Sequence, residues 1–209
     1  MERTTSIAEA KQVLGTNFIG PDELALIADK MGIKIPSEIP IIPYDLEDLK
    51  NKKNDYILII GASKMSNGKP LTLRALRDHF GINPDVSEPC FYNQDWYLKE
   101  NFIEKSLKSK WFLIRKNVFN ETRGKNPDEI INHYSFPTAI LCAYSFFIYW
   151  FHANECLWKH DFVWCNDLDA NDDRIYVARY FDPIGISKNG FSVHRHLRIR
   201  ENYGCAEEL

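Results

Sequence analysis

Residues 190–200 carry an alternation of side chains that could bind an anion. The segment reads Gly-Phe-Ser-Val-His-Arg-His-Leu-Arg-Ile-Arg. With the two-residue period of a strand, most apolar side chains share one face, whereas His194, His196, Arg198 and Arg200 share the other. Guanidinium and imidazolium groups donate charge-assisted hydrogen bonds to carboxylates and phosphates, and histidine makes such binding sensitive to pH. These four residues are the predicted ligand-binding set for an anionic small molecule or a protein partner.

The acidic segment 167–173 offers another use for this basic face. Its carboxylates could form cross-strand ion pairs with the basic side chains, worth about 0.2–1 kcal/mol each. Arg195 interrupts the apolar face, so we expect it to be paired or to lie at the edge of a sheet. The pattern favours a solvated, ion-paired face over a ligand site. The carboxylates in question belong to Asp167, Asp169, Asp172 and Asp173.

A second group of residues has the side chains of a zinc site. His152, Cys156, His160 and Cys165 are all zinc-ligand types. The spacing of four would place the first three on one side of a continuous helix, and Cys165 lies on the next predicted strand. The spacing matches no standard zinc finger, and buried cysteines are common without a metal. The residues therefore define a zinc hypothesis that competes with a packed helix end.

Segment 167–173 is also a candidate calcium loop, because carboxylates on alternate residues can converge on one ion. However, Asp172 stands where the turn glycine of an EF-hand is needed, and Ala178 where its bidentate glutamate is needed. A hairpin turn rich in Asp and Asn explains the segment better. We expect no cofactor, with zinc and calcium as the alternatives.

The segment Gly61-Ala-Ser-Lys-Met-Ser-Asn-Gly68-Lys69-Pro70 partly imitates a phosphate-binding loop. The nucleotide-binding motif has four residues between its glycines and ends in Lys-Ser or Lys-Thr, whose hydroxyl binds Mg²⁺. Here six residues intervene, and Pro70 offers neither a hydroxyl nor a backbone donor. The sequence indicates a surface turn at Gly68 rather than a nucleotide site.

Bulk properties disfavour several other functions. The 209 residues carry a net charge of −3, so no global field attracts nucleic acid or anionic lipid. A local basic segment with Lys108, Lys110, Arg115 and Lys116 beside Trp111 keeps nucleic acid open as a third candidate, although an amphipathic strand explains it better. No complete catalytic motif is present, which favours a binding protein over an enzyme.

Cellular location follows from the N-terminus, the cysteines and one apolar segment. The first ten residues contain no apolar run, which disfavours a secretory signal, and the five cysteines lack a disulfide-framework spacing. Both features predict a cytoplasmic protein with free thiols. Residues 130–154 contain no Asp, Glu, Lys or Arg, but their polar residues favour a buried central helix over a membrane span.

The elements that must position these residues can be read from caps and periodicity. Helices are predicted over 6–14, 21–31, 45–52, 72–80 and within 96–108, and a long helix from Asn126 towards Trp158 with a break before Pro137. Strands are predicted over 56–60, 111–119, 162–165, 175–181 and 191–199. The result is an α+β fold with helices mainly in the N-terminal and central parts and a small antiparallel sheet at the C-terminus.

The C-terminal quarter resembles the last strands of C-type-lectin-like domains. The resemblance rests on Phe-Val-Trp-Cys-Asn-Asp from residue 162, Arg-Ile-Tyr-Val-Ala-Arg-Tyr-Phe-Asp from residue 174 and Arg-Glu-Asn-Tyr-Gly-Cys from residue 200. That class includes formylglycine-generating-enzyme-like folds and the variable proteins of diversity-generating retroelements. The resemblance implies ligand or protein binding by a small rigid sheet, and carries over no calcium-binding or catalytic residue.

Taken together, the sequence predicts one α+β domain over 1–209, with 1–85 and 86–209 as an alternative subdivision. The favoured function is binding of an anionic ligand or protein partner by the basic strand face. The alternative is a metal-dependent hydrolase that uses the His152–Cys165 cluster or segment 167–173.

Overall fold

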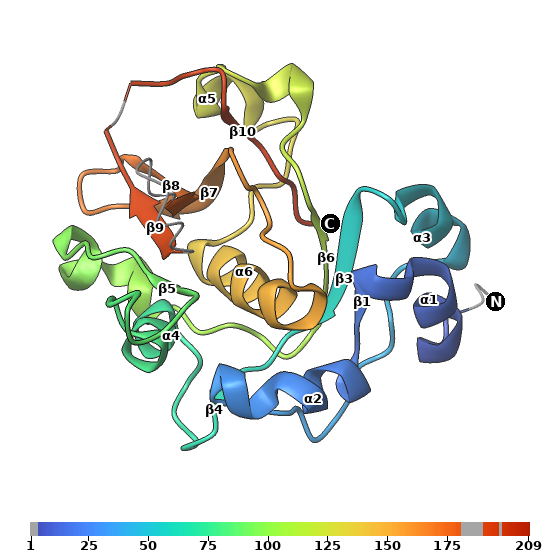
Figure 1. The fold of residues 1–209 in the computed structure, drawn as a ribbon. Coiled ribbons are helices and arrows are strands. Elements are labelled where there is room, and N and C mark those ends of the chain that lie inside the picture. Colours follow the sequence, from blue (N-terminus) through green and yellow to red (C-terminus); the bar gives the residue numbers. More distant parts are fainter. Residues whose placement is uncertain (1–3, 181–189, 197) are drawn as a thin grey trace.

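The computed structural model describes residues 4–180, 190–196 and 198–209, and it has the predicted α+β fold (Figure 1). Its α-helices are α1 (Ile7–Leu14), α2 (Pro21–Met31), α3 (Leu46–Lys52), α4 (Leu73–Phe80), α5 (Pro127–Ile130) and α6 (Ala139–Ala153). Short 3₁₀ helices are η1 (Gly15–Asn17), η2 (Trp96–Lys99), η3 (Asn101–Glu104) and η4 (Asn120–Thr122). Leu197, which the sequence pattern assigns to the apolar face, and Phe181, the last residue of a predicted strand, lie outside the described residues.

The strands form three sheets. The first has the order β1-β3-β6, with β1 (Phe18–Ile19), β3 (Tyr56–Ile60) and β6 (Trp111–Arg115). The second pairs β2 (Ile33–Lys34) with β4 (Lys64–Met65). The third has the order β10-β7-β8-β9-β5, with β5 (Cys90–Phe91), β7 (Phe162–Leu168), β8 (Arg174–Tyr180), β9 (Gly190–His194) and β10 (Tyr203–Gly204). Its three central strands are the predicted antiparallel meander, and its two outer strands pair in parallel.

Local signals account for most helix boundaries. The side chains of Ser6, Asp45, Thr72 and Asn126 each accept a backbone N–H in the first turn of the helix that follows. Gly32 ends α2 in the left-handed conformation, at φ 60°, where a Cβ would be strained. The predicted helices over 6–14, 21–31, 45–52 and 72–80 are therefore confirmed.

Three other predicted elements are shorter than expected. The helix predicted towards Trp158 ends at Ala153, because Asn154 adopts a left-handed conformation at φ 56°. Within 96–108 the chain forms the 3₁₀ helices η2 and η3 instead of an α-helix. Strand β6 ends at Arg115 rather than residue 119. The predicted break before Pro137 is confirmed, since α5 and α6 are separate helices.

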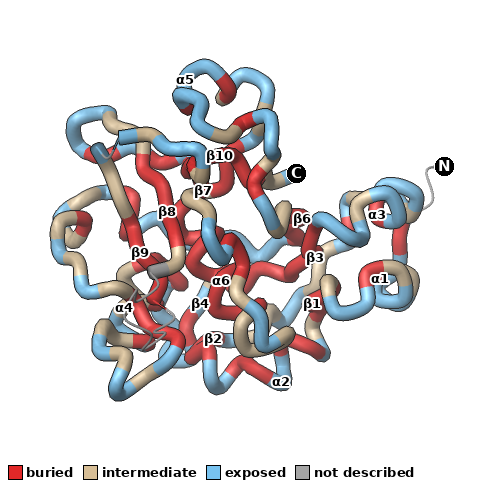
Figure 2. Tube along the Cα trace, turned by 45° about the horizontal axis from the view of Figure 1, so that its top comes forward, coloured by how far each residue is buried: buried red, intermediate tan, exposed pale blue. Residues whose placement is uncertain are grey.

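Helix α6 lies at the centre of the molecule, and in Figure 1 the other elements surround it. Its residues from Ala139 to Tyr149 are buried, and Figure 2 shows the helix as buried along most of its length. It packs against α2 and α4 and against strands β7, β8 and β9. The largely apolar composition of α6 is thus that of a helix enclosed by protein on all sides. Among the described residues, the structure contains no helix with the length and apolarity that a membrane span requires.

Both faces of the five-stranded sheet are covered. One face carries Phe191 and Val193 into the main core with α6. The opposite face forms a second cluster around Trp164, Tyr176 and Tyr203, which packs against residues of the α5 region. The sequence predicted a solvated second face, and that prediction is wrong because 126–136 and 199–205 fold over it.

Candidate functional site

The predicted basic strand is shorter than its sequence pattern. Strand β9 ends at His194, and the expected strand over 191–199 is wrong beyond that residue. The alternation does hold inside β9, because Phe191 and Val193 enter the core while Ser192 and His194 point to the other face. After β9, His196 adopts a left-handed conformation at φ 60°, which breaks the extended chain. His194, His196, Arg198 and Arg200 therefore do not form one continuous face.

His194 belongs to a directed hydrogen-bond chain inside the fold. The side-chain carbonyl of Gln94 accepts the Val193 N–H at 3.1 Å, so its amide group is the donor towards His194 Nδ1 at 3.5 Å. The imidazole proton is then on Nε2, which lies 2.9 Å from Ser192 Oγ. The Ser192 hydroxyl in turn donates to the Ala178 carbonyl at 3.0 Å. Every hydrogen bond in this series has one donor and one acceptor when His194 is neutral. The series therefore stabilises the neutral form of His194.

Burial strengthens this preference. Desolvation lowers the pKa of His194 to about 4, because its ring packs against Phe162 and Tyr176. A second proton would also turn Nδ1 into a donor facing the amide of Gln94. His194 is therefore neutral near pH 7 and supplies no positive charge for an anion, unlike the sequence-based expectation.

Arg195 is paired, as the sequence predicted. Its Nη1 lies 2.6 Å from Asp169 Oδ2 and 3.5 Å from Glu100 Oε1. Its guanidinium also lies over the ring of Trp96, 4.4 Å from the centroid. Burial alone would raise the pKa of Asp169, but Arg195 and two backbone N–H groups outweigh it, so the pKa lies below its usual value.

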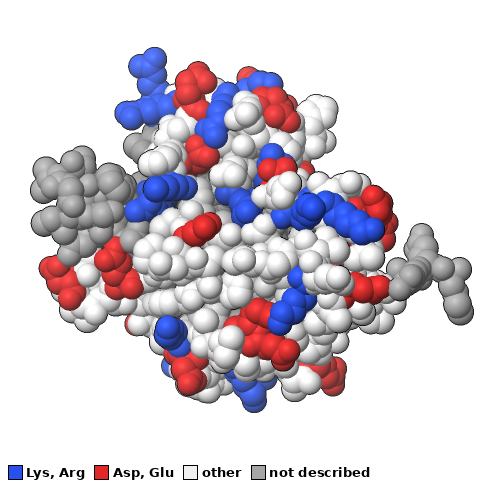
Figure 3. All heavy atoms as spheres, turned by 45° about the vertical axis from the view of Figure 1, so that its right-hand side comes forward, with Lys and Arg blue, Asp and Glu red and all other residues white. Residues whose placement is uncertain are grey.

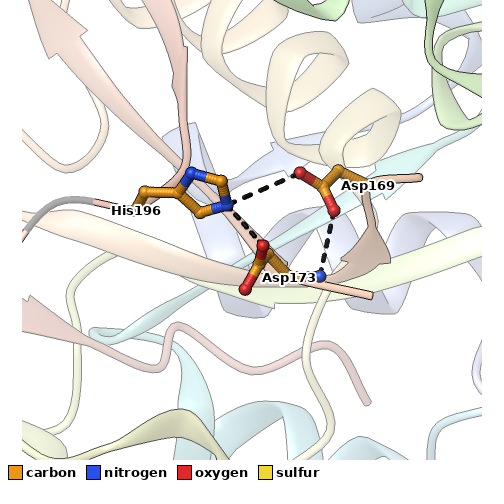
Figure 4. A group of neighbouring side chains, drawn as sticks. All are labelled: Asp169, Asp173 and His196. Carbon is orange, nitrogen blue, oxygen red and sulfur yellow. Dashed lines mark hydrogen bonds and ion pairs between the residues drawn. The ribbon is translucent and has the colours of Figure 1, made fainter. Parts of the chain in front are cut away.

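His196 lies beside the same acidic loop. Its Nε2 bonds to Asp173 Oδ2 and lies 3.8 Å from Asp169 Oδ2 (Figure 4). The ligand atoms of Asp169, Asp173 and His196 all lie within 4.8 Å of one another, which makes them the group in the described residues that could hold a metal ion. About half of the His196 and Asp173 side chains is exposed, whereas Asp169 is fully buried.

The loop itself is the predicted Asx-rich hairpin turn. Asp169 Oδ1 accepts the N–H groups of Asn171 and Asp173 at 2.8 and 3.0 Å, and Asp172 is left-handed at φ 64°. Both oxygens of Asp169 are therefore already used, one by the turn and one by Arg195. Asp167 has a different partner set, because it accepts the Ala139 N–H at the start of α6 and the Lys105 ammonium, each at 2.7 Å.

The four predicted zinc ligands are not gathered into a metal-binding group in the described residues. His152 lies in the last turn of α6, whereas Cys156 and His160 follow that helix, so one premise of the zinc hypothesis is wrong. Cys165 is fully buried on β7, where burial and a hydrogen bond with Cys142 raise the pKa of its thiol. Burial also raises the pKa of Cys156, and both shifts disfavour the thiolate that binds zinc.

A groove lies beside the acidic hairpin on the outer side of the five-stranded sheet. We call it the hairpin groove; its volume is about 460 Å³. Aromatic rings of the sheet and the polar start of α5 line it. The residues that line it are Asn126, Pro127, Asp128, Trp164, Leu168, Asp172, Asp173, Arg174, Tyr176, His196 and Ile199.

Two residues of the hairpin groove have buried N–H donors without an acceptor in the described chain. These donors are the indole Nε1 of Trp164 and the guanidinium Nε of Arg174. Another nitrogen of Arg174 donates to the Cys165 carbonyl at 3.2 Å, so the guanidinium is held in place. Buried donors are rarely left unsatisfied in native proteins. Both donors belong to residues that line the groove, although the two nitrogen atoms themselves are buried.

Charge on the molecular surface is mixed. On the face drawn in Figure 3, Lys and Arg side chains alternate with Asp and Glu, and neither sign dominates. Arg198 and Arg200 are exposed and have no ion pair with the described residues. Of the four predicted ligand residues, these two keep an unpaired charge, His196 lines the groove, and His194 is largely buried and neutral.

Sequence reasoning missed Gln94, Trp96 and Glu100, which fix the residues around β9. They lie about 100 positions before their partners, and no local pattern links such distant residues. It also missed Arg174, whose place at the start of β8 gave no sign of a groove.

Comparisons with protein-family models, with curated proteins and with solved structures found no match to this chain. The resemblance of its C-terminal quarter to C-type-lectin-like domains therefore stays a prediction.

Proposed function

We propose that this protein is a binding protein whose hairpin groove receives an anionic group of a ligand or partner. The observation that carries the proposal is the pair of acceptor-free donors on Trp164 and Arg174 in a groove that His196 also lines. Both nitrogens are buried, so the side chains around the groove would have to move before a carboxylate or phosphate oxygen could supply the acceptor that these donors lack. Asp169 and Asp173 already have partners of their own, because Arg195 pairs with Asp169 and the His196 imidazole bonds to Asp173.

The exposed arginines extend this proposal beyond the groove. Arg198 and Arg200 flank Ile199, which lines the groove, and their unpaired charges would attract an acidic partner. Asp128 and Asp172 at the groove limit the attraction, so specificity would come from the donors rather than from net charge.

The test is a titration with an acidic octapeptide at low salt, followed by NMR of the Trp164 indole N–H. We expect its resonance, identified by its loss in Trp164→Phe, to shift as peptide is added. Arg198→Glu with Arg200→Glu should abolish the shift, whereas the matched charge change Lys53→Glu with Lys99→Glu should preserve it. An unshifted indole, or an unchanged response in the arginine variant, would contradict the proposal.

The competing candidate is a metal-dependent hydrolase, and the group of Asp169, Asp173 and His196 is its single favourable observation. The Arg195 guanidinium already lies 2.6 Å from Asp169, where it neutralises the carboxylate that a cation would need. We therefore favour the binding protein. Elemental analysis after mild purification separates the two, since one equivalent of bound metal that Asp173→Asn removes would support the hydrolase.

A further inference from the structure

A second, smaller pocket lies next to the two-stranded sheet, away from the residues of the hairpin groove. It has a volume of about 240 Å³ and is bounded by β2, β4 and the chain that follows β2. We call it the lysine pocket. Its polar lining consists of Lys34, Ser37, Glu38, Ser63, Lys64 and Ser109.

The two lysines of this pocket face each other across the sheet. Lys34 and Lys64 are directly opposite in the antiparallel register of β2 and β4, so their side chains share one face. Both are exposed, and neither forms an ion pair within the described part of the chain. Like charges in directly opposite positions destabilise a strand pair. An anion between the two ammonium groups would remove this repulsion.

Two serine hydroxyls add neutral donors to the same pocket. Ser63 Oγ and Ser109 Oγ lie 2.9 Å apart and share one hydrogen bond. A hydroxyl that accepts still has its own proton to donate, and neither side chain has another hydrogen bond within the described residues. One hydroxyl proton of the pair therefore remains for a ligand.

A close backbone contact explains why Ser109 reaches Ser63. Gly61 N–H donates to the Lys110 carbonyl at 2.8 Å. A Cβ on Gly61 would lie 2.3 Å from the Lys108 carbonyl oxygen, so only glycine allows segment 108–110 to approach. The pocket is thus assembled from three stretches of chain that this contact and the β2–β4 pairing hold together.

We propose that the lysine pocket binds a tetrahedral oxyanion of the phosphate class. Two ammonium groups and one hydroxyl would donate to its oxygens, and with the Glu38 carboxylate the lining still has a net positive charge. The site uses Ser63 and Lys64 of the glycine-containing segment that only partly imitates a nucleotide-binding loop. It needs no Mg²⁺-binding hydroxyl, which Pro70 could not supply. The proposal is independent of the hairpin groove.

The test is a calorimetric titration of the full chain with inorganic phosphate at low ionic strength. Lys34→Gln with Lys64→Gln should weaken binding by at least about tenfold, because each lost charged hydrogen bond contributes substantially. Glu38→Gln should tighten binding, since it removes the pocket's carboxylate. The matched control Lys53→Gln with Lys99→Gln loses the same charge elsewhere and should bind like the parent protein.

Amide NMR shifts locate the ion and provide the second measurement. Phosphate should shift the amides of Ser63 and Lys64, and unchanged circular dichroism should show that these exposed substitutions leave the fold intact. A parallel titration with glycerol phosphate identifies the source: tighter binding indicates a phosphomonoester, and weaker binding indicates the free ion. Absence of binding by both anions overturns the proposal. If the pocket variant and the control variant lose the same phosphate affinity, phosphate binds as an adventitious ion only, and the proposal is overturned.

Discussion

His194 has a different role in the structure from the anion-binding role that the sequence predicts. In the sequence it is part of a basic alternation, whereas in the fold it is a largely buried side chain that links Gln94 and Ser192. Its low pKa follows from burial, and the hydrogen-bond chain reinforces it by leaving Nδ1 as an acceptor. His196, two positions later, lies at the surface beside Asp173 and the hairpin groove.

The neutral state of His194 predicts a loss of stability in acid. Above pH 6.5 the imidazole is neutral in both folded and unfolded chains, so it contributes no pH dependence. As the pH falls from 6.5 towards 4, His194 binds a proton in the unfolded chain but not in the folded one. This difference lowers the free energy of unfolding. The full loss is about 3 kcal/mol.

Urea unfolding of the parent protein and His194→Asn between pH 7.5 and 4 measures this effect. The variant should be less stable at pH 7.5 and should show a shallower decline with acid. His160→Asn, a change at an exposed histidine, should keep the parent's slope. Parallel curves for His194→Asn and the parent would show that His194 does not supply this pH dependence.

At the scale of elements, Arg195 connects three segments that are distant in the sequence. It joins the β7–β8 hairpin through Asp169, the η2 helix through Trp96, and its own segment after β9. The indole of Trp96 also donates to the Val193 carbonyl, and Gln94 accepts the Val193 N–H, so side chains cover the edge of β9 that extends beyond its pairing with β5. The loop that carries the candidate site is thereby held against the sheet.

Arg195→Met should therefore destabilise the protein by about 2–4 kcal/mol, because it leaves the fully buried Asp169 carboxylate without its counter-charge. Removing both charges in Asp169→Asn with Arg195→Met should recover much of that loss. The free energy of unfolding, measured by urea titration, gives the coupling between the two residues. If the double variant were as unstable as the sum of the single variants, the ion pair would not be the cause.

At the scale of the whole molecule, the C-terminal segment joins the two larger sheets. Strand β10 pairs with β7, and the next residues bond to β6, where Arg115 N–H donates to the Glu207 carbonyl and Leu209 N–H to the Leu113 carbonyl. The main core likewise contains residues from both sides of position 85, since α6 packs on α2 and β6 pairs with β3.

This arrangement predicts one cooperative unfolding transition. Tryptophan fluorescence, which samples Trp111 in one sheet and Trp164 in the other, should change at the same urea concentration as the far-ultraviolet circular dichroism. A separate fragment of residues 1–85 should remain unfolded, because β3 would lose its partner β6. Two distinct transitions would instead favour the subdivision at residue 85.

The sequence by itself determined the elements whose signals are local. The caps at Ser6 and Thr72, the proline at the start of α2 and the Asx turn at Asp169 all act within a few residues, so they could be predicted directly. The pairing of Arg195 was also predictable, because a lone charge on an apolar face requires a partner.

Only the tertiary structure decided which residues form sites. Ser109 reaches Ser63 across 46 positions, and Gln94 reaches His194 across 100, so neither contact has a sequence period that could reveal it. The alternation in 190–200 correctly gave the two faces of β9, but the solvation of the outer face depended on whether another segment covers it. Long-range packing depends on the whole chain. For this reason the four predicted ligand residues became one largely buried histidine, one histidine beside the hairpin groove and two exposed arginines.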